Sequence, residues 1–161
     1  MTPATLAPYP ELTFKDYQHY DFKSKGPASA VASCYLQVGN CAGVCNFPLI
    51  FFGNFPFIEF FNAVTGRGME MGEILETGAR IQTMRQCFNI REGITAAEIR
   101  LPARMKGIPP MKSGPVAGIT IDEQSLGREY RKAMGWEPDS GVPSEGTLKR
   151  LGLDALLTEA G

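Results

Sequence analysis

The strongest pattern of hydrophobic and polar positions runs from Glu70 to Asn89. Apolar residues recur there at steps of three and four, whereas charged residues occupy positions between them. This spacing predicts an amphipathic helix, with acidic residues leading and basic residues following, as the helix dipole favours. The expected core face comprises Met71, Ile74, Leu75, Gly78, Ile81, Met84 and Phe88.

Weaker patterns predict shorter helices on both sides of this segment. Asp122 is a suitable N-cap, and Gly66 is a suitable residue to end a helix. Thr95 to Glu98 matches a capping box, which predicts a short helix before Pro102. In all, five more helices are expected, over residues 28–42, 54–65, 95–101, 122–135 and 143–152.

Two apolar or proline-rich stretches shape the connections. Residues 54–65 are apolar nearly all round, which predicts a buried helix. Pro48 should stop any helix from continuing past Phe47. Residues 101–118 hold four prolines and three glycines, which predicts a loop across the surface.

Composition supports a single helical domain with an extended N-terminal arm. The chain has 161 residues, with 18 glycines and 12 prolines, so its elements should be short and its connections many. Residues 1–27 carry four prolines and no helical period, which predicts an extended arm. Residues 28–161 form the remaining domain. The predicted class is all-α, a compact bundle of short helices with proline- and glycine-rich connections.

Charge and the N-terminal sequence exclude several classes of partner. The 16 basic and 17 acidic side chains nearly balance, so nucleic acid and anionic membranes are not expected partners. The longest apolar run, residues 47–64, is interrupted by Pro48, Asn54, Pro56 and Glu59, so it is expected in the core rather than in a membrane. No signal-peptide pattern precedes the four cysteines, which predicts reduced thiols and a cytoplasmic location.

The four cysteines are the most informative candidates for chemistry. Cys34, Cys41 and Cys45 are spaced seven and four residues apart, close to one helical face if the helix continued. They could be small buried hydrophobic residues or metal ligands, and the spacing matches no standard zinc or iron–sulfur site. A complete site within this chain would also need Cys87. The single histidine, His19, lacks a partnered nucleophile for catalysis.

Several ordered blocks of the sequence resemble the C-terminal part of the aldehyde:ferredoxin oxidoreductase family. The resemblance extends over nearly the whole chain from about Leu12. Because several blocks agree in order, it is far more specific than a single motif. The blocks are Asn62–Gly66, Gly78–Ile81, Phe88–Gly93, Leu101–Pro102, Gly114–Pro115, Gly135–Trp136, Gly141–Pro143 and Leu148–Leu153.

The resemblance implies a cofactor site in the segment from Asn40 to Phe47. Enzymes of this family oxidise aldehydes to carboxylic acids and pass electrons to ferredoxin, with a tungsten or molybdenum bis-pterin and a [4Fe-4S] cluster. Their loop of the form Asp-x-x-Gly-Leu-Cys-(Asp/Cys) binds one pterin and supplies one cluster cysteine. By this correspondence Cys45 is the metal ligand, and the pterin-binding residues are Asn40, Gly43, Val44 and Asn46.

The same resemblance implies that other parts of the enzyme are needed. In the family, the pterin-binding domain and three further cluster cysteines lie upstream, so this chain should be inactive without such domains or a chain carrying them. Seven of the ten phenylalanines fall between Phe47 and Phe61, a density typical of a face that meets another domain. Asn40 replaces the expected aspartate and loses its charge. A degenerate domain that serves as a binding or assembly module therefore stays open as the alternative.

Overall fold

The computed structural model describes residues 25–51 and 55–157, and this part of the chain is helical. It contains no strand and only two isolated β-bridges, so the all-α prediction is confirmed. None of its helices is long and apolar enough to cross a membrane. The elements are α1 (Lys25–Cys41), α2 (Asn46–Phe51), α3 (Phe57–Thr65), α4 (Met71–Arg91), α5 (Glu123–Ala133), α6 (Glu145–Arg150) and the 3-10 helix η3 (Asp154–Leu157).

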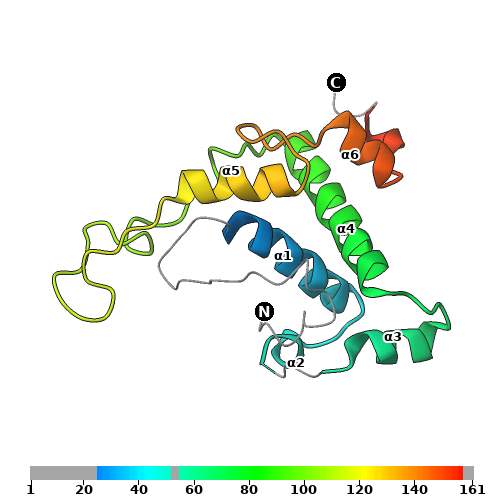
Figure 1. The fold of residues 1–161 in the computed structure, drawn as a ribbon. Helices are drawn as coiled ribbons and strands as arrows, with labels where there is room; N and C mark the ends of the chain where they lie inside the picture. Colours follow the sequence, from blue (N-terminus) through cyan, green and yellow to red (C-terminus); the bar gives the residue numbers. More distant parts are fainter. Residues whose placement is uncertain (1–24, 52–54, 158–161) are drawn as a thin grey trace.

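Helix α1 is the centre of the arrangement, since it packs against both α4 and α5 (Figure 1). Helices α2 and α3 lie near the C-terminal end of α1. Helix α6 lies near the C-terminal end of α4. The long connection between α4 and α5 projects away from the helices. The loop predicted over residues 101–118 forms much of this projection.

The buried side chains form three clusters along this frame. The largest joins the second half of α1 to α2, α3 and the start of α4, through Tyr35, Val38, Leu49, Phe57, Met71 and Ile74. A second cluster joins α1 to the end of α5, through Ala30, Cys34, Met134 and Trp136. The third lies under α6 and consists of Leu148, Leu151 and Leu153.

Two glycines let α1 approach its neighbours closely. A Cβ on Gly78 of α4 would lie 2.7 Å from the Cα of Cys34 and still nearer to the Cys34 carbonyl. A Cβ on Gly26 of α1 would lie 2.7 Å from the backbone nitrogen of Tyr130 in α5. The Cβ of Glu129 lies nearer still to that position, at 2.3 Å. Backbone and Cβ atoms cannot rotate away, so only glycine allows these helices to cross at this separation.

Several predicted helix ends are confirmed. The Asp122 carboxylate accepts a hydrogen bond from the Ser125 backbone N–H at 3.1 Å, as an N-cap does. Gly66 ends α3 in the left-handed conformation, with its N–H donating to the Asn62 carbonyl at 2.7 Å. The Asn62 side chain also pairs with the backbone of Met69, accepting from its N–H at 2.7 Å and donating to its carbonyl at 2.8 Å. This amide therefore holds the turn between α3 and α4.

The predicted boundaries were wrong in two places. Pro48 does not prevent a helix, because α2 begins at Asn46 and the proline lies in its first turn, where the missing N–H has no intrahelical partner. No helix follows Thr95. The Glu98 carboxylate accepts a hydrogen bond from the Thr95 N–H at 2.7 Å and another from the Thr95 hydroxyl at 2.9 Å, so the hydroxyl does not cap a helix.

Burial was also overestimated for two helices. In α3 only Phe57 is buried, and Phe60 and Val64 are exposed. In α4 the first half of the predicted face is in the core, whereas Met84 and Phe88 are exposed. The first helix begins at Lys25, three residues earlier than predicted, and residues 1–24 of the predicted arm lie outside the described part of the chain.

Candidate functional site

The connection between α1 and α2 contains the predicted pterin-binding residues. Gly43 has a φ of 74°, in the left-handed region that glycine adopts readily. Its N–H donates to the Asn40 carbonyl at 3.1 Å, and the N–H of Val44 donates to the Gly39 carbonyl at 2.9 Å. These two bonds form a Schellman motif that ends α1. The Val44 side chain packs against the core, and Cys45 follows it directly in the chain.

Cys45 is exposed, and so is Cys41, the last residue of α1. The amide nitrogen of Gln37 lies 3.5 Å from the Cys41 sulfur. The Cys45 thiol is free, and no described side chain hydrogen-bonds or pairs with it.

The two asparagines of this segment differ in their surroundings. Asn40 is exposed near the end of α1. Asn46 begins α2 and is half-buried, and its side-chain oxygen is enclosed without a hydrogen-bond partner among the described residues. A buried carbonyl oxygen without a donor is costly, so an external donor at this position would stabilise the site.

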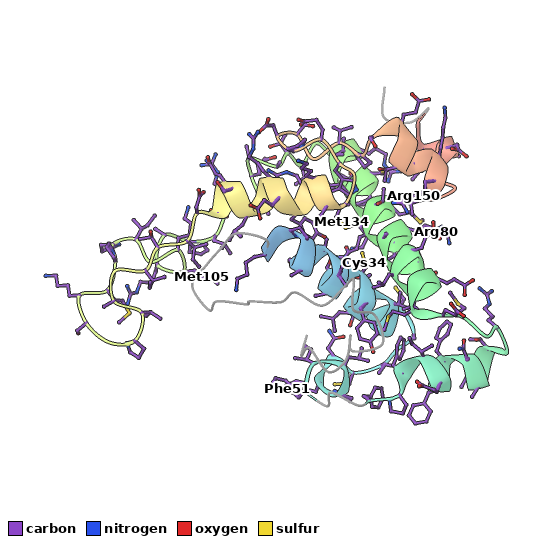
Figure 2. The ribbon with its side chains drawn as sticks, in the orientation of Figure 1. Cys34, Phe51, Arg80, Met105, Met134 and Arg150 are labelled. Atoms are coloured by element: carbon purple, nitrogen blue, oxygen red, sulfur yellow. The ribbon has the colours of Figure 1, made fainter. Side chains whose placement is uncertain are left out.

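The other two cysteines belong to the core. Cys34 is buried, and its thiol lies 3.8 Å from the sulfur of Met134; both residues are labelled in Figure 2. Burial raises the pKa of the Cys34 thiol to about 11 and also raises the pKa of Cys87, which packs against the α6 cluster. The four cysteines therefore do not form a metal site by themselves. Across residues 25–51 and 55–157, no three His, Cys, Asp or Glu side chains are grouped to hold a metal ion.

Exposed aromatic side chains follow Cys45 directly. Phe47 and Phe51 lie one turn apart on α2 with ring centroids 5.4 Å apart, and they are 68% and 66% exposed. Phe51 stands at the outer end of this helix, away from the α1–α4 crossing (Figure 2). The cysteine and an unburied apolar surface thus share one end of the molecule.

A comparison with known protein families identifies the family of this chain. The family described as "Aldehyde ferredoxin oxidoreductase, domains 2 & 3" matches residues 5–153. The chain belongs to the aldehyde ferredoxin oxidoreductase family. Its members are oxidoreductases, and the match is to the second and third domains of the family. A comparison with curated proteins gave no match.

The sequence blocks typical of the aldehyde ferredoxin oxidoreductase family hold the helices together here. Gly78 allows the close crossing with α1, and Arg80, two residues later, donates through Nε to the Leu151 carbonyl at 2.7 Å. Trp136 packs in the second cluster, and its indole N–H lies 3.3 Å from the Thr83 hydroxyl. These blocks are therefore explained by packing, whereas the exposed Cys45 is not.

The residues of the α1–α2 connection fit a cofactor of this family only as one contribution among several. A four-iron cluster needs four ligands, and Cys45 offers one exposed thiol. The unpartnered oxygen of Asn46 suits a hydrogen-bond donor such as a pterin N–H. The helix that begins at Asn46 differs from the predicted end at Phe47, because Pro48 lies in the first turn of α2 rather than after a helix. His19 lies outside the described residues.

Thiol labelling should separate the four cysteines into classes. In the folded chain, Cys41 and Cys45 should react rapidly with a chromogenic disulfide reagent at pH 8, since both are exposed. Cys34 should react only after unfolding, because it is buried and its pKa is about 11. Mass spectrometry of the time course identifies each site. Labelling of Cys34 as fast as Cys45 would contradict this assignment.

Proposed function

We propose that this chain is the C-terminal part of a tungsten- or molybdenum-pterin aldehyde ferredoxin oxidoreductase. It supplies Cys45 to a [4Fe-4S] cluster and the Asn40–Asn46 segment to one pterin. Upstream domains, on the same or another polypeptide, supply the remaining ligands and enclose the cofactors. Family membership over residues 5–153 and the exposed thiol of Cys45 support this proposal.

The exposed position of Cys45 is the strongest support for the proposal. A ligand for a cofactor enclosed mainly by another domain must lie at the edge of its own domain. Cys45 is exposed, and it follows a rigid helix-ending motif rather than a long loop. Its backbone is held by Val44, whose side chain is anchored in the core. A preorganised ligand of this kind loses little conformational entropy on binding.

Asn46 and Asn40 have different roles in this proposal. The enclosed oxygen of Asn46 accepts a hydrogen bond from the pterin, which satisfies a group that lacks a partner within the described chain. Asn40 is exposed and uncharged where the family has a carboxylate, so it contributes a weaker hydrogen bond than an aspartate would. Gly43 closes the helix and contributes through its backbone.

The bound cofactors supply the redox chemistry, which converts an aldehyde to a carboxylic acid and passes electrons to ferredoxin. This chain's residues hold and orient those groups, and Phe47 and Phe51 cover part of the contact with the upstream domains. The isolated chain should therefore reduce no dye in the presence of aldehyde.

The decisive experiment compares Cys45→Ser with Cys41→Ser in the enzyme assembled from this chain and the upstream pterin domains. Both thiols are exposed and lie four residues apart, so the second variant is a matched control. Cys45→Ser should lower cluster iron and dye-linked aldehyde oxidation at least about tenfold, since a hydroxyl is a poor ligand for iron. Cys41→Ser should keep both near the wild-type level. Iron content and the cluster's spectroscopic signal are measured on the same samples.

Two results would contradict the proposal in different ways. Full iron content in Cys45→Ser would remove the ligand role of Cys45. An assembled complex that holds neither iron nor tungsten or molybdenum, even with the wild-type chain, would favour the degenerate binding module, for which the loss of charge at Asn40 is the supporting feature.

A further inference from the structure

A polar cavity of about 530 Å³ lies where the α4–α5 connection meets α5. It is lined from residue 96 in the connection to Asp139 beyond α5, and it includes no residue of the Asn40–Asn46 segment. Four basic and three acidic side chains face it, which leaves an excess of one positive charge. The basic residues are Arg100, Lys106, Arg128 and Arg131.

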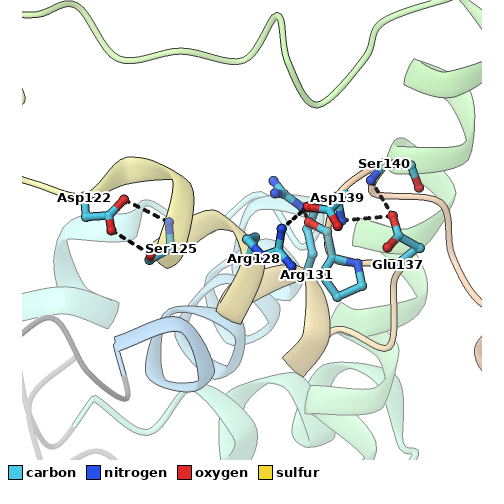
Figure 3. A network of polar contacts seen from close by, with 8 residues as sticks. Asp122, Ser125, Arg128, Arg131, Glu137, Asp139 and Ser140 are labelled. Atoms are coloured by element: carbon cyan, nitrogen blue, oxygen red, sulfur yellow. Dashed lines mark hydrogen bonds and ion pairs between the residues drawn. The ribbon is translucent and has the colours of Figure 1, made fainter.

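The three acidic side chains are already engaged. Glu123 accepts from the Leu101 N–H with one oxygen, and its other oxygen lies 3.0 Å from the Lys106 ammonium. These contacts lower the pKa of Glu123, so the carboxylate is charged at neutral pH. Asp122 binds the hydroxyl and backbone N–H of Ser125 (Figure 3).

Asp139 completes this set through an ion pair with Arg128 (Figure 3). Lys106 and Arg128 are therefore neutralised by Glu123 and Asp139. The charges that remain are those of Arg100, Arg131 and Asp122, whose carboxylate is hydrogen-bonded to the neutral Ser125, so the two arginines give the cavity its excess of one positive charge.

Arg100 and Arg131 have no ion-pair partner within the described residues. Each uses its Nε to donate to a backbone carbonyl, Arg100 to Ala97 and Arg131 to Pro138, the latter at 2.5 Å. These bonds orient the two side chains, and their terminal nitrogens have no hydrogen-bond partner among the described residues. The guanidinium of Arg131 lies beside Gly127, one turn earlier on α5, where an added Cβ would be 3.1 Å from one of its terminal nitrogens. Two guanidinium groups held in this way on one cavity suit an oxyanion.

The cavity also has an apolar wall, made by Ile99, Ile108 and Ile121. We propose that this cavity binds a small organic anion, whose carboxylate or phosphate is held by Arg100 and Arg131 and whose apolar part lies against the three isoleucines. The site is independent of the cofactor role proposed for Cys45, because the two share no residue. Its members are spread from residue 96 to 139, which is why no local sequence motif indicates it.

Calorimetric titration of the full 161-residue chain tests this site with three probes: inorganic phosphate, butyl phosphate and butyrate. Each should bind at a ratio of 1:1, and butyl phosphate should bind more tightly than inorganic phosphate because its chain meets the apolar wall. Arg100→Gln and Arg131→Gln should each weaken binding about tenfold, which corresponds to about 1.4 kcal/mol. Lys132→Gln removes an exposed charge next to Arg131 outside the cavity and should leave binding unchanged.

Each other outcome counts against the proposal. Absence of saturable binding to all three probes would overturn it, as would equal weakening by Lys132→Gln, which indicates only general attraction. Equal affinity for phosphate and butyl phosphate would remove the role of the isoleucine wall. Should Arg131→Gln fail to fold, Arg100→Gln decides the result alone, since Arg100 lies in an exposed connection.

Discussion

Replacement of Gly78 by alanine should lower the free energy of unfolding by about 3 kcal/mol. The new methyl group would lie 2.7 Å from the Cα of Cys34 and nearer still to its carbonyl, and backbone atoms cannot rotate away as a side chain can. Helices α1 and α4 would have to separate, which loosens the two clusters that they share. For a chain of this size the melting temperature should fall by about 6–12 °C.

Gly72 provides the matched control for Gly78. It lies in the first turn of the same helix, and a Cβ there would meet nothing within 4 Å. Gly72→Ala should therefore stabilise the chain by about 0.5 kcal/mol, because alanine is the better helix former. Denaturant unfolding of both variants measures the difference. If the two variants changed the free energy of unfolding by the same amount, the α1–α4 crossing would not be as close as described.

Truncation of Ile74 to alanine should cost about 3 kcal/mol. Ile74 is 0% exposed and lies in the largest cluster, between Tyr35 and Val38 of α1 and Phe57 of α3. Removal of its outer carbons leaves a cavity that three helices cannot fill by a small shift, because each is held by other buried contacts. The measurement is the midpoint of unfolding in urea at constant slope.

Met84→Ala tests whether this cost is specific to buried positions of α4. The sequence pattern places Met84 on the same face as Ile74, but the side chain is 49% exposed. Its truncation should change the free energy of unfolding by less than about 0.5 kcal/mol. A loss as large as that of Ile74→Ala would mean that the second half of α4 is buried in solution.

The contrast between Ile74 and Met84 shows why a helical pattern overstates the core. A period of 3.6 defines which residues share a face, but not how far along the helix a neighbour covers that face. The apolar contacts of α1 lie along the first half of α4, whereas its contacts with the second half are polar, such as the hydrogen bond from Arg85 to Gln37. Thr83 is completely buried next to Trp136, although a polar residue is ordinarily expected on the exposed face of a helix.

Local signals explain the predictions about the candidate site that were correct and those that were wrong. The end of a helix near Gly43 follows from glycine's conformational freedom, which acts within one turn. The sequence does not predict the helix that begins at Asn46, because a proline such as Pro48 can either end a helix or lie in the first turn of one. Here the packing of Leu49 against α1 and α3 favours the second arrangement. The ligand role of Cys45 stays a prediction for the assembled enzyme.

The sequence by itself determined the helical class, the long helix from Met71, the cap at Asp122 and the helix end at Gly66, because hydrophobic periodicity and capping act between residues a few positions apart. Family membership also follows from the order of its sequence blocks. Only the tertiary structure decided that Gly78 is a crossing point, that Cys34 is buried while Cys45 is exposed, and that Arg100 and Arg131 share a cavity. Those features depend on which segments far apart in the chain come to lie together. A pattern of residues a few positions apart carries no information about such long-range contacts.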